Sequence, residues 1–194
     1  MKECVVARPR DRIVGTARSL FHKLGFRGVG VDTIAEEAGT NKMTLYRHFD
    51  SKDDLIVECL RSAAMEARKF WLDIEAKHPN DRRAQLDAWI GLAAQALASD
   101  CRGCDLTNAA VELTDTDHPA HRVIEEFKAE HRNWLATVCA GAGVVRAELL
   151  ASTLTTLLEG ARVARQSAAR QSPSVDFAAM AAAVVESFRR KPSR

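Results

Sequence analysis

Residues 42–48 combine short polar and basic side chains of the kinds that contact DNA. Lysine and arginine donate to phosphate oxygens and to guanine, threonine offers a hydroxyl and a methyl group to base edges, and tyrosine and histidine can hydrogen-bond phosphate. Leu45 and Phe49 stand four positions apart, so one side of a helix over residues 43–49 would be buried and the other would face outward. We expect the outward side to enter the major groove of double-stranded DNA. Its candidate contact residues are Lys42, Thr44, Tyr46, Arg47 and His48.

The elements that would position this helix form a helix-turn-helix pattern. Apolar residues recur at helical spacing over residues 10–24, and Gly25 can end that helix. A short helix is predicted over residues 31–38, and Asn41 is a suitable N-cap for the helix over residues 43–49. Two short helices packed on a longer first helix are typical of proteins that place the second short helix in the major groove.

Helical patterns continue to the end of the chain and predict an all-α protein. A fourth helix is predicted over residues 52–77, and a turn signal follows it. We expect two domains: a helix-turn-helix DNA-binding domain over residues 1–52 and a larger helical domain over residues 53–194, connected by the fourth helix. Further helices are expected near residues 82–99, 104–114, 119–140, 147–170 and 175–190.

Composition and charge narrow the function. The 194-residue chain is 46% hydrophobic, enough to bury a sizeable core, and its net charge is only +2. Residues 1–52 carry ten Lys and Arg against six Asp and Glu, so a net +4 coincides with the predicted DNA-binding domain. We expect a cytoplasmic protein, because no membrane-spanning run or secretory signal is visible. No phosphate-cradling glycine loop, nucleophile elbow or convincing metal set indicates an enzyme or a cofactor.

The stretch FHKLGFRGVGVDTIAEEAGTNKMTLYRHFDSKDDL resembles the N-terminal domain of the TetR family of bacterial transcriptional regulators. The resemblance implies a homodimer whose third helices enter successive major grooves of a palindromic operator, and a C-terminal domain that binds a small-molecule effector and the second protomer. It implies a transcriptional repressor that the effector releases from DNA. It also implies DNA contacts by Lys42, Thr44, Tyr46 and His48, with Lys52 on phosphate, and the chemistry of Arg47 adds that residue to the set.

Two departures from the family pattern affect the predicted contacts. Val29 and Gly30 replace hydroxyl-bearing residues before the second helix, so a hydroxyl contact to phosphate is lost, and backbone amides and Thr33 are the candidates to replace it. Met43 replaces a residue that is often small, and its side chain can meet a thymine methyl group. The operator sequence therefore cannot be taken from relatives.

Cys101 and Cys104 form a CxxC pair within CRGCDLTNAAVEL, which resembles a stretch that many family members carry at the start of the sixth helix. A packing role for Cys104 is the favoured interpretation. The alternative is a redox-responsive regulator whose DNA binding is switched at Cys101 and Cys104. Zinc is disfavoured, because no second ligand pair stands at a suitable spacing.

Aromatic residues of the C-terminal region could line a ligand pocket, although an ordinary core role is the favoured interpretation for each of them. The candidate lining residues are Trp71, Trp89, Phe127 and Trp134. The candidate polar anchors are Asn108, Glu112, His131 and Arg162. An acidic anchor such as Glu112 would favour a cationic ligand.

One stripe of the helix predicted over residues 147–170 is apolar. The family resemblance implies that this helix and the last one form a four-helix bundle with the second protomer, and the alternative is a stripe packed in the core of its own chain. The predicted dimer-interface residues are Leu150, Leu154, Leu157, Leu158 and Ala161.

Overall fold

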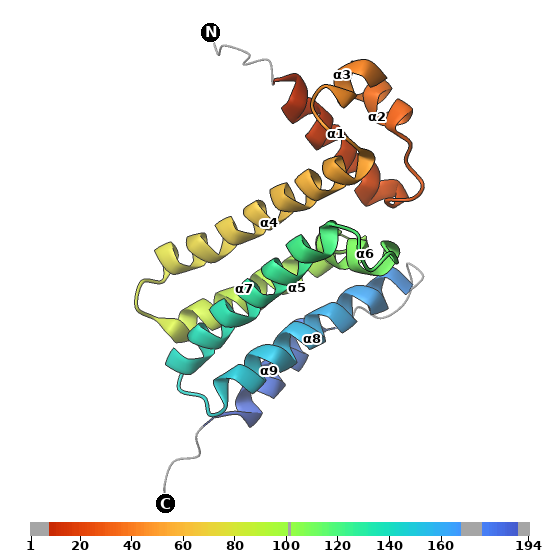
Figure 1. The fold of residues 1–194 in the computed structure, drawn as a ribbon. Helices are drawn as coiled ribbons and strands as arrows, with labels where there is room; N and C mark the ends of the chain where they lie inside the picture. The colour runs from red at the N-terminus through yellow and green to blue at the C-terminus, as the bar shows by residue number, and fades with distance from the viewer. Residues whose placement is uncertain (1–7, 101, 168–175, 190–194) are drawn as a thin grey trace, which may run out of the picture. The chain divides into compact units, whose positions relative to one another are not determined.

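The computed structural model describes residues 8–100, 102–167 and 176–189, and these residues form helices joined by turns (Figure 1). The extended pairing within the described ranges is an isolated bridge between Val144 and Arg189. The predicted all-α class, with an N-terminal helix-turn-helix and a larger helical region after it, is confirmed. No helix in the described ranges is long and apolar enough to cross a membrane.

Contacts divide the chain into two compact units. Unit 1 comprises Met1–Met65 with Asp105–Glu125, and unit 2 comprises Glu66–Cys104 with Glu126–Arg194. Unit 1 therefore contains more of the chain than the DNA-binding domain predicted over residues 1–52. That functional boundary stays a prediction.

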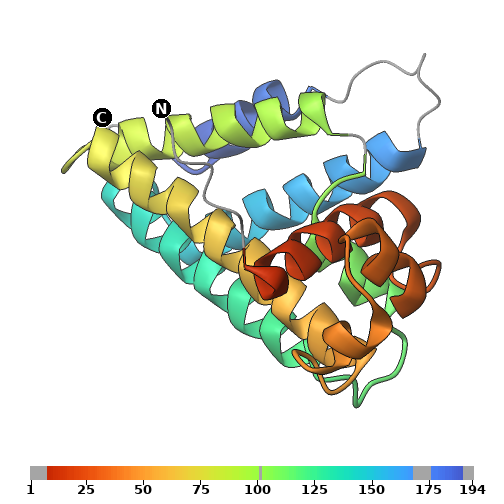
Figure 2. The ribbon, with the colours of Figure 1, turned by 90° about the horizontal axis from the view of Figure 1, so that it is seen from above.

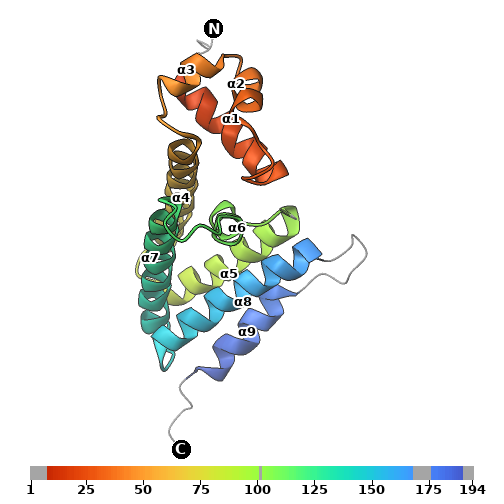
Figure 3. The ribbon, with the colours of Figure 1, turned by 45° about the vertical axis from the view of Figure 1, so that its right-hand side comes forward.

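The first unit is built around three N-terminal helices, α1 (Pro9–Leu24), α2 (Val31–Glu37) and α3 (Lys42–Tyr46). It also contains the first part of α4 (Lys52–Lys77), α6 (Asp105–Glu112) and the first turns of α7 (Ala120–Gly141). Proline suits the first position of α1, because an amide at that position has no partner within the helix. The α1 helix packs on α2, and α2 packs on α3 (Figure 3). Their shared core includes Ile13, Ala17, Phe21, Ile34 and Leu45.

Two local features fix the turn between α2 and α3. Gly39 has a φ of 63°, a left-handed conformation that glycine adopts without strain. The side chain of Asn41 accepts a hydrogen bond of 2.8 Å from the backbone N–H of Thr44, as predicted for an N-cap. The α3 helix ends at Tyr46, however, and not at Phe49. The N–H of His48 bonds to the carbonyl of Leu45, which tightens the last turn, and Ser51 then caps α4 by accepting from Asp54 N–H.

The second unit combines α5 (Arg82–Ser99), α8 (Ala147–Ser167) and α9 (Phe177–Ser187) with the remaining parts of α4 and α7. The α5, α8 and α9 helices pack on one another, and α9, in dark blue, runs alongside α5, in yellow-green, in Figure 2. Aliphatic side chains fill the space between them. The ends predicted for the last two helices, residues 168–170, 175 and 190, lie outside the described residues.

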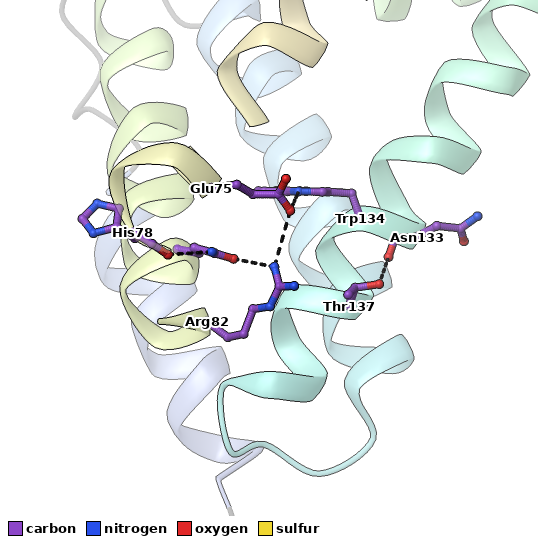
Figure 4. A network of polar contacts seen from close by, with 7 residues as sticks. Glu75, His78, Arg82, Asn133, Trp134 and Thr137 are labelled. Carbon is purple, nitrogen blue, oxygen red and sulfur yellow. Dashed lines mark hydrogen bonds and ion pairs between the residues drawn. The ribbon is translucent and has the colours of Figure 1, made fainter. Parts of the chain in front are cut away.

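A network of polar contacts stabilises the turn between α4 and α5 (Figure 4). Glu75 accepts from Trp134 Nε1 at 3.2 Å and from Arg82 at 3.4 Å. Gln85, only 2% exposed, accepts from Arg82 at 2.7 Å and donates to the carbonyl of His78 at 2.8 Å. These bonds satisfy both ends of the buried amide, so its burial carries no desolvation penalty for an unpaired group.

Candidate nucleic-acid interface and ligand pocket

The α3 helix has a buried side and an exposed side. Leu45 is fully buried and Phe49 is 5% exposed, whereas Met43 and Tyr46 are 69% and 43% exposed. Lys42, Arg47 and His48 are also exposed, and Thr44 is half-buried. Positions 42, 43, 46 and 47 share one side of a helix because they are three or four residues apart. The exposed surfaces of this methionine and tyrosine, flanked by cations, are available to contact another molecule.

An exposed ion pair links α2 to α3. The Lys42 ammonium lies 3.0 Å from a carboxylate oxygen of Asp32. The hydrogen bond to Asp32 raises the pKa of Lys42, so the group is fully cationic at neutral pH. Because both side chains are more than half exposed, phosphate oxygens can replace the carboxylate at little cost.

Lys52 is held inside unit 1. Its ammonium donates to the carbonyl oxygen of Phe26 at 2.7 Å and lies 5.8 Å from the centre of the Phe21 ring. Burial lowers the pKa of Lys52. The bond uses one of three donors and ties the start of α4 to the turn after α1. The predicted phosphate contacts of Lys52 and of the exposed Thr33 stay predictions.

Contacts between α6 and the end of α1 were not foreseen from the sequence. Asp105, at the start of α6, lies 2.6 Å from His22 Nδ1 and 3.5 Å from the Arg18 guanidinium. Glu112, at the end of α6, accepts from the backbone N–H of Phe26 at 2.7 Å. Both ends of α6 are therefore fixed to residues in or just after α1. No sequence signal could have shown these pairs, which are 83 to 87 residues apart.

This arrangement changes the interpretation of two predicted ligand anchors. Asn108 and Glu112 lie on α6 in unit 1, and the aromatic candidates lie in unit 2. Glu112 is an acceptor for the backbone of Phe26, and its carboxylate is next to Gly25. These two residues therefore belong to a different unit from the other candidates.

Unit 2 contains a pocket of about 420 Å³, a volume in the range of ligand sites. Five predicted residues line it: Trp71, Trp89, Phe127, His131 and Arg162. The remaining lining is mostly apolar and comprises Ala67, Phe70, Ile74, Leu92, Ala93, Gln95, Ala96, Ser99, Cys104 and Leu158. The predicted set therefore contains most of the aromatic residues of the pocket, but it lacks Phe70 and every α5 residue of the lining except Trp89.

One wall of the pocket is an aromatic stack. The Trp71 ring, from α4, packs against Phe127, His131 and Trp134 of α7, with ring centres 5.5, 5.1 and 5.7 Å apart. These α7 residues are three or four positions apart and so form one row on the helix. Trp134 supports Trp71 and bonds to Glu75, but it is not among the residues that line the pocket.

His131 is neutral in this pocket. Burial, with the positive charges of Arg162 and Arg132, lowers its pKa to about 4. Its Nε2 accepts a hydrogen bond of 3.1 Å from Trp89 Nε1, which places the ring proton on Nδ1. His131 therefore contributes an aromatic surface and no charge at neutral pH.

The cysteines differ in their surroundings. Burial raises the pKa of Cys59 to about 12 and that of Cys139 to about 11, so both are poor nucleophiles. Cys104 is a half-buried free thiol that lines the pocket. Cys101 lies outside the described residues, and the redox alternative stays a hypothesis.

The structure places most of the predicted dimer stripe in the core of its own chain, and a dimer interface on this helix stays a prediction. Leu150 and Leu154 are fully buried, and Leu158 and Ala161 are 4% exposed, in the core formed with α5 and α9 of the same chain. Side chains that are already inaccessible cannot bury further area against a second protomer. Leu157 is only partly buried. It lines a shallow groove on the other side of α8 with Ala161 and with Leu149, Ser152, Thr153, Thr156, Gly160, Ala164 and Met180.

The α2–α3 arrangement, with a capped second helix that exposes polar and basic residues, defines a helix-turn-helix protein. The family model for bacterial regulatory proteins of the tetR family matches residues 13–59. This match covers less than half of the chain and shows that residues 13–59 are similar to the N-terminal domain of TetR-family regulators. The proteins similar to this chain are transcription regulators and not enzymes.

Relatives of known structure and function agree with this placement. A TetR-family transcriptional regulator from Streptomyces coelicolor is 28% identical, with a TM-score of 0.86 over 94% of this chain and 96% of that one. A regulator from Agrobacterium tumefaciens, 20% identical, has the same fold, with a TM-score of 0.80 over 94% of this chain and 98% of its own.

Two curated relatives are repressors. The transcriptional repressor KstR2 of Rhodococcus jostii is 29% identical over 140 residues, which cover 68% of this chain and 64% of KstR2. The negative transcriptional regulator IcaR of Staphylococcus aureus is 35% identical over 52 residues, or 27% of this chain and 28% of IcaR. The chain thus matches less than two thirds of the length of either repressor.

Proposed function

We propose that the protein is a cytoplasmic transcriptional repressor that binds a palindromic operator as a homodimer and is released from DNA by a small molecule bound in unit 2. The observation that carries the DNA-binding part is the exposed set on α3, which includes Met43, Tyr46 and Arg47. The repressor names of KstR2 and IcaR favour repression over activation.

DNA recognition would divide between two kinds of contact. Lys42, Arg47 and His48 can reach phosphates or guanine, while Thr44 and Met43 can meet base edges. Asn41 and Leu45 hold α3 in place from its other side. Two protomers related by a two-fold axis would place two such helices one helical turn of DNA apart.

Dimerisation would use the outward groove on α8 and α9. The groove is lined by small residues, among them Gly160 and Ala164, and by the exposed apolar residues Leu149 and Met180. Small residues allow the helices of two protomers to approach closely, and burying the exposed apolar groups would stabilise the pair.

Coupling between ligand and DNA would run along the chain at the start of α6. Cys104 lines the pocket, and the next residue, Asp105, holds His22 and Arg18 of α1. A ligand that displaces residue 104 would therefore act directly on an anchor of α1. Ligand binding and DNA binding would then be reciprocally linked.

Fluorescence anisotropy with the protein's own upstream DNA tests the assignment of α3. We expect Tyr46→Ala and Arg47→Ala to weaken binding by about tenfold to a hundredfold at a fixed salt concentration. Arg61→Ala, an exposed substitution on α4, is the matched control and should bind as the wild type does. Wild-type affinity in both α3 variants would refute the assignment.

A further inference from the structure

The pocket of unit 2 contains one formal charge. Among the described residues that line it, Arg162 is the only Asp, Glu, Lys or Arg. Arg162 is half-buried, and within the described part of the chain it has neither a hydrogen-bond acceptor nor an ion-pair partner. The carboxylate of Glu159, three positions earlier on α8, is engaged by Lys128 at 3.0 Å.

An unpaired guanidinium against apolar walls is unfavourable by itself. Removing a cation from water costs free energy unless an anion replaces the lost hydration. The same apolar walls strengthen the attraction to an anion, because the effective dielectric constant is lower than in water. Planar guanidinium is well suited to bind a carboxylate or sulfonate through two hydrogen bonds.

The other lining groups favour an apolar, flat body. Trp71 and Phe70 line the pocket, and Phe70 is 57% exposed. The Trp89 N–H is already used by His131 and Phe70 has no donor, so these two residues offer the ligand an aromatic surface only. Gln95 and Ser99 add neutral polar groups.

We propose that the pocket of unit 2 binds a flat, largely apolar organic anion, whose acidic group pairs with Arg162 and whose body lies against Trp71 and Phe70. The inference rests on the proposed function only for the role of this ligand as the effector. It reverses the charge expected from Glu112, because that carboxylate lies in unit 1 and the pocket has a cation in its wall.

Two fluorescent probes with the same aromatic body test the charge preference. Anilinonaphthalene sulfonate carries a negative charge, and N-phenylnaphthylamine is its neutral counterpart. We expect wild-type protein to bind the sulfonate more tightly. Arg162→Gln should weaken sulfonate binding by about tenfold or more, the effect typical of a charge-assisted hydrogen bond, and leave binding of the neutral probe within twofold.

Two further variants distinguish an effect of the charge in the pocket on probe binding from an effect of the protein's net charge. Arg132→Gln removes an exposed cation next to His131 that does not line the pocket, so it should bind both probes as the wild type does. Arg162→Lys keeps the charge but loses the planar fork, and an intermediate sulfonate affinity is expected. Thermal melting of each variant establishes that it is folded.

The outcomes are distinct. Equal weakening of both probes in Arg162→Gln, or equal binding of both probes by the wild type, would overturn the inference. Selective loss of the sulfonate supports it. A sulfonate that binds at Arg162 but leaves operator affinity unchanged would count against effector release in the proposed function and would leave the inference intact.

Discussion

On α3 most of the side chains proposed to touch DNA are exposed, whereas most of the aromatic side chains that line the pocket of unit 2 also pack the protein. Tyr46 is 43% exposed, and Trp89 is 5% exposed with its N–H bonded inside the unit. The DNA surface can therefore change in sequence with little effect on stability. The pocket cannot change in sequence without loss of stability, because its aromatic wall is part of the core. This difference can be tested.

The largest expected effect concerns a third surface, the outward groove on α8 and α9. As on α3, a substitution there should affect binding to another molecule and have little effect on the stability of the monomer. Met180→Glu would remove an exposed apolar contact from both protomers, weakening dimerisation by about 3–6 kcal/mol while leaving the monomer folded. Light scattering after gel filtration measures the mass. Met65→Glu, at a 55% exposed methionine on α4, is the control and should remain dimeric. A dimeric Met180→Glu protein would show that the groove is not the interface.

Aromatic substitutions compare the two sites directly. Trp89→Ala should lower the free energy of unfolding by about 3–5 kcal/mol, because it leaves a cavity and an unpaired acceptor on His131. Tyr46→Ala should change it by no more than about 0.5 kcal/mol. Urea denaturation measures both. Equal destabilisation by the two substitutions would contradict the contrast between the sites.

Acid should destabilise unit 2 through His131. The folded pKa is about 4, below the unfolded value of 6.5, so the unfolded chain binds a proton first as the pH falls. The contribution of His131 to stability is complete above pH 6.5 and is lost progressively towards pH 4, by up to about 3 kcal/mol. His131→Phe should be less sensitive to pH over that range in denaturant titrations. His48→Asn, at an exposed histidine on the DNA surface, should retain the wild-type dependence.

The smallest effect is expected at the start of α3. Asn41→Ala removes the acceptor for Thr44 N–H and should cost about 1 kcal/mol of stability. It should also weaken operator binding, because α3 would be less ordered. Asn41→Ser, which preserves a capping oxygen, should recover most of both losses. An alanine variant with unchanged DNA affinity would show that the cap is not needed to hold the reading surface.

Local sequence information was sufficient for α3 and insufficient for the later helices. The alternation of Leu45 and Phe49 with exposed polar residues, and the Asn41 cap, involve positions within one or two turns of each other. The end of α3 was predicted three residues too late. The tightened turn at His48 does not change the spacing of the apolar residues in the sequence, so the spacing could not show it.

Two of the site predictions depend on tertiary packing, which spacing along the chain does not show. Glu112 was assigned to the ligand, but its partner is the backbone of Phe26, 86 residues away. The α8 helix is apolar on two sides, with Leu154 facing the core of its own chain and Leu149 exposed. Spacing along one helix identifies each apolar row but cannot tell which row faces a second molecule.

The distribution of chromophores follows from the aromatic stack described above. The chain has three tryptophans, and all of them, Trp71, Trp89 and Trp134, belong to unit 2. Its single tyrosine, Tyr46, lies on the outward side of α3. Indole emission therefore reports on the pocket, and phenol emission reports on the DNA surface. A titration of the unlabelled protein can thus show whether binding at one site changes the emission of the chromophore at the other site.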